Sequence, residues 1–182
     1  MSGRWPIFAA AVLAGCAGAT TTDGSGRPAS TATGSTVAPD FTARDVEGKT
    51  FRLSDHVGKQ VVLLDFWATY CEPCKAEFPQ LRAMYDERRS EGLLVVGVAM
   101  DGPESLAEVP AFVNRSGIDF PVVLDDDSRI ASLYNPKKSM PLSVLIAKDG
   151  HIAVVREGYN PGDERLVAED VRRALADGNA LK

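Results

Sequence analysis

The chain has 182 residues, enough for one domain with a hydrophobic core, and a formal net charge of −5. This mildly acidic composition, without a basic stripe, disfavours nucleic acid as a partner. Neither His56 nor His151 lies at ligand spacing from a cysteine, which disfavours a zinc finger, and Lys75 occupies the position where haem attachment needs a histidine.

The first 15 residues resemble a targeting segment. Arg4 is the only early charged side chain, and residues 7–13 (IFAAAVL) form an apolar run too short to span a bilayer in the usual way. The run ends in Leu-Ala-Gly before Cys16, which resembles the cleavage box of bacterial lipoproteins. We therefore expect residues 1–15 to be a lipoprotein signal peptide and Cys16 to carry lipid. An ordinary signal peptide or a buried N-terminal helix is the alternative.

Lipidation of Cys16 predicts a lipid-anchored protein of the bacterial cell envelope that faces the periplasm, where disulfides persist. The choice between inner and outer membrane stays open. Residues 16–36 are then the lipidated cysteine and a flexible tether, because Gly, Ser, Thr and Ala dominate them and cannot bury enough apolar surface to fold. We expect the folded domain to cover residues 37–182.

The predicted elements of this domain alternate between strands and helices, which indicates an α/β fold with a mixed sheet covered on both faces. Apolar spacing after Cys74 predicts a helix that Pro79 kinks and Gly92 ends. Asn160 is expected to cap the last helix. In chain order the elements are a hairpin (41–44 and 50–53), a strand (61–66), a helix (74–91), a strand (93–99), a helix (104–114), a strand (121–124), a short helix (128–134), two strands (142–147 and 152–156) and a helix (161–177).

Cys71 and Cys74 lie at the start of the first predicted helix. A helix N-terminus carries about half a positive charge and free N–H groups, so a thiolate there is stabilised and its pKa falls. The thiolate is the attacking species in disulfide exchange. We therefore expect Cys71, at the exposed end, to be the nucleophile. Cys74, further inward, would resolve the mixed disulfide, and Pro73 would stiffen the turn between them.

The segment at 66–81, FWATYCEPCKAEFPQL, resembles the active site of the thioredoxin superfamily, and within it the TlpA/ResA-like membrane-tethered thiol–disulfide oxidoreductases. VAPDF at 37–41, FPVVLDDD inside residues 101–138 and Ser-Met-Pro-Leu at 139–142 support the narrower match. The resemblance covers residues 37–175. It implies a thioredoxin-like mixed β-sheet flanked by helices, with an N-terminal β-hairpin and a central insertion.

The resemblance also assigns roles to two acids. Asp65 stands where thioredoxins carry a buried acid near the second thiol, although many TlpA/ResA-like proteins lack it. Burial would raise its pKa and let it accept the proton of Cys74; a buried carboxyl satisfied by hydrogen bonds alone is the alternative. Glu77 would tune the pair and take part in proton transfer, or it would be a first-turn acid that interacts with the helix dipole.

Five residues are expected at the substrate surface. Trp67 either packs beside the site or is a core aromatic, and Tyr70 replaces the Trp usual before the first cysteine. The resemblance implies a cis bond at Pro141, in a loop that faces Cys71 and offers the backbone of Met140 to a substrate strand. An ordinary strand-opening proline is the alternative. The expected substrate-binding residues are Trp67, Tyr70, Pro73, Met140 and Pro141.

These features predict an enzyme without metal or cofactor that exchanges thiols and disulfides on exported proteins. Reduction, for example during cytochrome c maturation, is the direction that the resemblance favours, with electrons from a membrane thiol–disulfide donor. We expect a monomer. Three alternatives stay open. A thiol peroxidase is disfavoured by Ala68, where peroxiredoxins have Thr, a Cu(I) chaperone by the close cysteine spacing, and a structural disulfide by the short loop it closes.

Overall fold

The computed structural model of this chain describes residues 31–32 and 36–180. The predicted signal peptide, the lipidated Cys16 and nearly all of the tether lie outside these residues, so these expectations stay predictions. Thr31 and Ala32 are the exception: they were expected in the flexible tether, but they form a short strand that pairs with Val155 and Val154 of the sheet. Within the described part of the chain, no helix is both long and apolar enough to cross a membrane.

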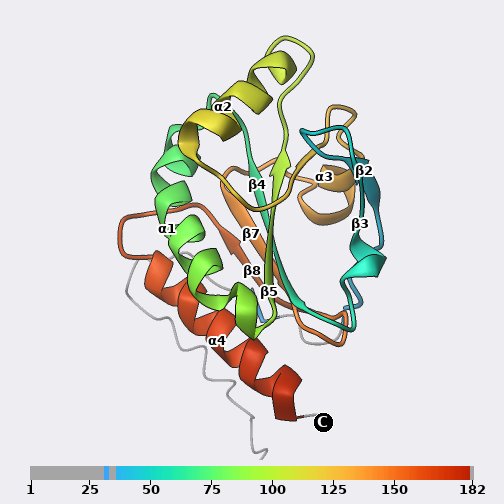
Figure 1. The fold of residues 1–182 in the computed structure, drawn as a ribbon, viewed down its shortest axis with the longest axis vertical. Coiled ribbons are helices and arrows are strands. Elements are labelled where there is room, and N and C mark those ends of the chain that lie inside the picture. The colour runs from blue at the N-terminus through green and yellow to red at the C-terminus, as the bar shows by residue number, and fades with distance from the viewer. Residues whose placement is uncertain (1–30, 33–35, 181–182) are drawn as a thin grey trace, which may run out of the picture.

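The centre of the described fold is a mixed six-stranded sheet (Figure 1). Three strands in the middle and at one edge are parallel, and the strands on the other side run antiparallel to their neighbours. The prediction of a mixed sheet is therefore confirmed. Across the sheet the order is β1 (Thr31–Ala32), β8 (Ile152–Glu157), β7 (Leu142–Ile146), β4 (Val61–Trp67), β5 (Leu93–Ala99) and β6 (Val122–Leu124).

Helices cover both faces of this sheet, as Figure 1 shows. One face packs against α1 (Glu72–Arg88), α2 (Val109–Ser116) and α4 (Glu164–Ala180). The opposite face packs against α3 (Arg129–Tyr134) and the predicted hairpin, which is a separate two-stranded sheet. The hairpin strands are β2 (Thr42–Arg44) and β3 (Thr50–Arg52).

Alternation along the central strand β4 explains the two layers, because successive side chains of a strand point to opposite faces. Val62, Leu64 and Phe66 contribute to the core beneath α3 and the hairpin. Val61, Leu63 and Trp67 contribute to the core beneath α1, α2 and α4. All seven residues of β4 are buried, which is why the strand reads as a continuous apolar run with one acid.

Two predicted helices begin later than the sequence indicated. The helix expected over 104–114 begins at Val109, after a short 3-10 turn at Leu106–Glu108, because Pro110 suits the first turn of a helix and not its interior. The helix expected from 161 begins at Glu164. Gly162 has φ 107°, outside the helical range, and Asn160 donates its N–H to Asp163 Oδ2 in a turn. Asn160 therefore does not cap α4.

Candidate active site

Cys71 and Cys74 form a disulfide at the start of α1, with their Cα atoms 5.3 Å apart. Cys71 is the N-cap residue, and its Sγ accepts a hydrogen bond from the N–H of Cys74 at 3.3 Å. Pro73 lies exposed in the first turn, where a missing N–H costs nothing. Cys71 is only 7% exposed, so it is less open than the exposed helix end that the sequence predicted, but it remains more accessible than Cys74, which is 1% exposed. The predicted position of the pair at a helix N-terminus is confirmed.

The loop before the disulfide is held by a buried acid that the sequence analysis did not single out. Asp101 is fully buried just after β5, and its carboxylate accepts the N–H of Thr69 at 3.0 and 3.2 Å and also the hydroxyl of Thr69. Nearby, the N–H of Met100 donates to the carbonyl of Trp67 at 2.8 Å. These bonds fix the backbone two residues before Cys71. An acid directly after a buried strand is the one sequence signal that could have indicated this role.

Asp65 and Glu77 form a pair of buried carboxyls beneath α1. Asp65 lies on β4 and is 1% exposed, and Glu77 lies on α1 and is 4% exposed. Neither oxygen of Asp65, nor Oε2 of Glu77, has a hydrogen-bond partner in the described part of the chain. The alternative of an Asp65 satisfied by hydrogen bonds therefore does not fit the structure. The alternative of Glu77 as a first-turn acid does not fit either, because α1 begins at Glu72 and Glu77 lies beyond its first turn.

Burial controls the protonation of both acids, because a low dielectric disfavours the charged form. It raises the pKa of Asp65 to about 7. Burial raises the pKa of Glu77 to about 9, and the neighbouring carboxyls of Asp65 and Asp163 add to this increase. Glu77 is three residues after Cys74 on the same helix, so the two side chains share a face. Two buried carboxyls with raised proton affinity thus lie in the same part of the core as Cys74.

Trp67 does not lie at the substrate surface. Its side chain is fully buried, and its ring packs edge-on against Phe78 with centroids 4.9 Å apart and against Phe112 at 5.1 Å. Trp67 is therefore a core aromatic residue and does not contact the substrate directly. Tyr70, by contrast, is 59% exposed immediately before Cys71.

The loop before β7 has the geometry that the family resemblance implied. The Met140–Pro141 peptide bond is cis. Ser139, the residue before Met140, is held by the buried side chain of Asn135. The Asn135 amide donates to the carbonyl of Ser139 at 2.7 Å and accepts the N–H of Ser139 at 2.9 Å. Met140 is partly buried against the core cluster that contains both cysteines. Neither its N–H nor its carbonyl takes part in a hydrogen bond among the described residues, so both are free to pair with an added strand.

The described residues contain no group of three or more His, Cys, Asp and Glu side chains that could hold a metal ion. A mixed sheet covered by helices, a Cys-x-x-Cys disulfide at a helix N-terminus and a cis-proline before β7 define a thioredoxin-fold protein with a dithiol–disulfide site.

Comparison with known proteins identifies the family. Residues 35–155 match the AhpC/TSA family, and the chain belongs to it. The thiol-disulfide oxidoreductase ResA of Geobacillus kaustophilus (strain HTA426) is 35% identical over 144 residues, which cover 79% of this chain and 76% of that protein. The ResA protein of Bacillus subtilis (strain 168) is 40% identical over 121 residues, which cover 66% of this chain and 65% of that protein.

Solved structures agree with this assignment. The crystal structure of a thiol:disulfide interchange protein of the thioredoxin family from Chlorobium tepidum TLS superposes with a TM-score of 0.66 at 26% identity, covering 83% of this chain and 99% of that one. The chain is therefore a thiol–disulfide oxidoreductase of the ResA type with its redox pair at Cys71 and Cys74. The family resemblance stated from the sequence is confirmed.

Proposed function

We propose that this enzyme reduces disulfides of exported proteins outside the cytoplasm, held on a membrane by lipid on Cys16. The observation that carries the proposal is the asymmetry of the pair. Cys71 is 7% exposed and directly follows the exposed Tyr70, whereas Cys74 is 1% exposed and shares a helix face with the buried Glu77. Apocytochrome c is one substrate that the resemblance to TlpA/ResA-like proteins suggests. The lipoprotein-like box before Cys16 supports the anchor and the extracytoplasmic location.

The reaction has two exchange steps. In the reduced enzyme the Cys71 thiolate attacks one sulfur of the substrate disulfide, and the other substrate sulfur leaves as a thiolate. Cys74 then gives up its proton and attacks the Cys71 sulfur, which releases the second substrate thiolate and forms the Cys71–Cys74 disulfide. Two electrons have passed to the substrate. A membrane thiol–disulfide donor returns two electrons to the enzyme.

In this proposal the two buried acids have different roles in proton transfer. With its pKa raised to about 7, Asp65 is partly ionised at neutral pH and is able to accept the proton of Cys74. The pKa of Glu77, raised to about 9, keeps that side chain protonated, so it serves as the reserve donor when the disulfide is reduced again. The free backbone groups of Met140 bind the substrate as an added strand beside the cis-proline.

A trapping experiment in the native bacterium tests the proposal. Cys74→Ala in the full chain should accumulate mixed disulfides between Cys71 and exported proteins, and Cys71→Ala should accumulate none. Trapping by Cys71→Ala alone would reverse the roles of the two cysteines, and trapping by neither would contradict exchange. The Cys16→Ser variant should leave the membrane fraction.

Two parallel assays address the alternative functions. Peroxide consumption faster than disulfide reduction by the purified reduced enzyme would favour a thiol peroxidase. Tight Cu(I) binding without disulfide exchange would favour a copper chaperone.

A further inference from the structure

A row of polar residues crosses the sheet beneath α1 and α4. Asp65 on β4 is directly opposite Ser143 on β7, and Ser143 is directly opposite Arg156 on β8. Directly opposed residues of neighbouring strands point to the same face. The guanidinium of Arg156 therefore belongs to the same row as the buried carboxyl of Asp65, two strands away.

The same cation also shares a cavity with Glu77. Glu77, Ser143, Arg156, Tyr159 and Asp163 contribute to the lining of a narrow cavity of about 10 Å³ between the sheet, α1 and the start of α4. A buried arginine commonly pairs with a buried carboxyl, because an unpaired charge in a low dielectric is costly. Yet Oε2 of Glu77 and both oxygens of Asp65 have no hydrogen-bond partner among the residues described.

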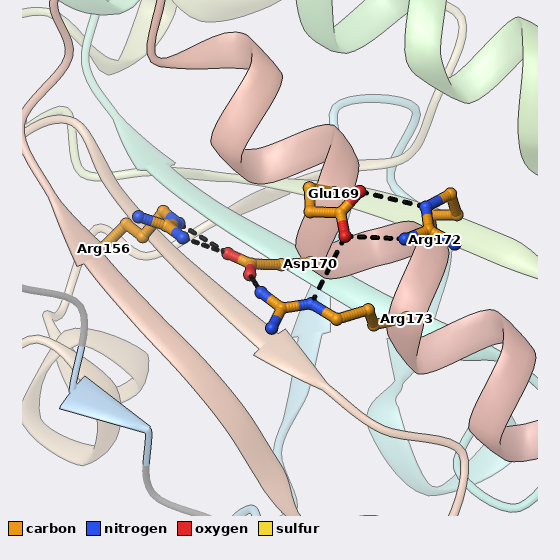
Figure 2. A network of polar contacts seen from close by, with 5 residues as sticks. All are labelled: Arg156, Glu169, Asp170, Arg172 and Arg173. Atoms are coloured by element: carbon orange, nitrogen blue, oxygen red, sulfur yellow. Dashed lines mark hydrogen bonds and ion pairs between the residues drawn. The ribbon is translucent and has the colours of Figure 1, made fainter.

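Asp170 on α4 explains why Arg156 does not pair with these acids. Oδ2 of Asp170 accepts Nη2 of Arg156 at 2.5 Å and Nε at 2.6 Å, and its Oδ1 accepts Nη2 of Arg173 (Figure 2). Asp170 is only 4% exposed and the Arg156 side chain 16% exposed. Both ends of the Asp170 carboxylate are thus occupied, and the Arg156 guanidinium is directed toward α4.

We propose that Asp170 is a positioning residue that holds the Arg156 guanidinium on α4 and away from the Asp65–Glu77 carboxyl pair, so that the pair keeps its proton. An opposite charge within about 4–6 Å lowers the pKa of a carboxyl by about 1–3 units. The causes that raise the pKa of Asp65 and Glu77 are burial and neighbouring carboxyls, which fits a guanidinium held elsewhere.

Other groups near Glu77 do not replace Arg156. Arg88 on α1 is held by Glu87 at 2.9 Å and Glu91 at 3.4 Å. The remaining neighbours are acidic or neutral and therefore raise the proton affinity of Glu77 or leave it unchanged. The titratable and charged groups that face Glu77 across its two cavities or affect its charge are Asp65 on β4, Arg156 on β8, Tyr159 and Asp163 in the loop before α4, Glu164 at the start of α4, and Glu87 and Arg88 on α1.

The test is a carbon-13 NMR titration of the side-chain carboxyls in the oxidised full chain, with the Glu77 signal assigned from Glu77→Gln. Asp170→Asn keeps the shape of the side chain but removes the charge that holds Arg156, so that the guanidinium is drawn to the carboxyl pair, and it should weaken proton binding by Glu77 about tenfold or more. Asp170→Asn combined with Arg156→Gln should restore the parent titration. Glu169→Gln is the matched control, because Glu169 is on the same helix and pairs with Arg172 and, at 3.9 Å, with Arg173, but not with Arg156.

Arg156→Gln alone supplies an independent result, since Asp170 stays paired with Arg173 and the fold is not left with an unpaired buried acid. It should leave the titration of Glu77 unchanged. A clear rise in the proton affinity of Glu77 in Arg156→Gln would overturn the proposal, because Arg156 would already act on Glu77 in the parent. An unchanged titration in folded Asp170→Asn would overturn it equally.

The consequence for catalysis rests on the proposed function. Asp65 is the proposed acceptor of the Cys74 proton, and a carboxylate beside a guanidinium is a weaker base. Asp170→Asn should therefore slow disulfide reduction at neutral pH, and the double variant should recover. An altered titration with unaltered turnover would contradict the proton role proposed for the pair and leave the position of Arg156 intact. The two proposals therefore fail separately.

Discussion

The two faces of β4 differ in what they bury. Toward α3 and the hairpin the strand presents Val62, Leu64 and Phe66, which pack against apolar neighbours. Toward α1 and α4 it presents Asp65 and Trp67, and the cysteines pack on that side. A single strand therefore separates a face that mainly stabilises the fold from a face that carries the redox chemistry.

The difference between the two faces shows that side chains needed for catalysis can oppose folding. Burying apolar side chains is favourable by about 25 cal/mol per Å². Burying a carboxyl without partners opposes folding unless the group stays protonated. The α1–α4 face accepts this cost at Asp65 and Glu77. On the α3 side the buried acid Asp125 has partners instead, because its two oxygens accept the N–H groups of Ile130 and Ala131 at 2.8 Å each.

Removing the nucleophile is the sharpest way to test the chemical face. Cys71→Ser should lower disulfide reduction to the background rate, because a hydroxyl is not ionised near neutral pH and does not exchange with disulfides. Reduction of a model protein disulfide with excess dithiol donor measures this loss. The fold should persist, as seen by an unchanged far-UV circular dichroism spectrum. Residual exchange close to that of the parent would show that the chemistry does not depend on this face.

Two adjacent aromatic residues compare the faces directly. Phe66 and Trp67 are both fully buried on β4 but point to opposite faces. Either change to Ala should cost about 3–5 kcal/mol in the free energy of unfolding, measured with denaturant. Only Trp67→Ala should also change the exchange rate of the folded fraction, since Trp67 packs in the cluster that contains both cysteines. An equal change in rate for Phe66→Ala would break the distinction.

The stability of the oxidised protein should fall as the pH rises. The folded-state pKa is raised from 3.8 to about 7 for Asp65 and from 4.5 to about 9 for Glu77, so the folded protein binds these protons more tightly than the unfolded chain does. Their contribution is complete below about pH 4 and is lost as the pH rises through about 7 and 9.

Glu77→Gln tests this pH dependence. Each pKa unit corresponds to about 1.4 kcal/mol, so the variant should be more stable than the parent by a few kcal/mol at pH 9 and similar to it at pH 4. Denaturant unfolding across this range measures the difference. Asp86→Asn is the control, because Asp86 is an exposed acid on the same helix that pairs with Arg89 and lines neither cavity with Glu77. A parent protein that gains stability between pH 5 and 9 would contradict the buried-acid interpretation.

Local patterns predicted most of the sheet and the position of the cysteines. The strand expected at 93–99 is β5 to the residue, because a fully buried strand is a continuous apolar run. The predicted starts of α2 and α4 were wrong by a few residues. Pro110 in the first turn of α2 and the positive φ of Gly162 before α4 fix where these helices begin. The cis bond before Pro141 came from the family resemblance, and no spacing rule indicates it.

The interior of the chemical face could not be predicted in the same way. Ser143, Arg156 and Asp170 are separated in sequence from Asp65 and approach it only because β7 lies between β4 and β8 and α4 packs on top. A one-dimensional pattern contains no such neighbour relation. The burial of Trp67 could not be predicted for the same reason. Whether this ring lies in the core or at the surface is decided by Phe78 of α1 and Phe112 of α2, which pack against it.

The smallest effect should come from polar contacts on the outside of α4. Glu169 and Arg172 form hydrogen bonds of 2.6 and 3.0 Å, but their side chains are 49% and 57% exposed (Figure 2). Water and salt weaken an ion pair so exposed, so Arg172→Ala should leave the unfolding midpoint and the exchange rate within error of the parent. A clear loss of stability would mean that charge alone, rather than burial, makes this side of the molecule sensitive, and the contrast between the two faces would then need another cause.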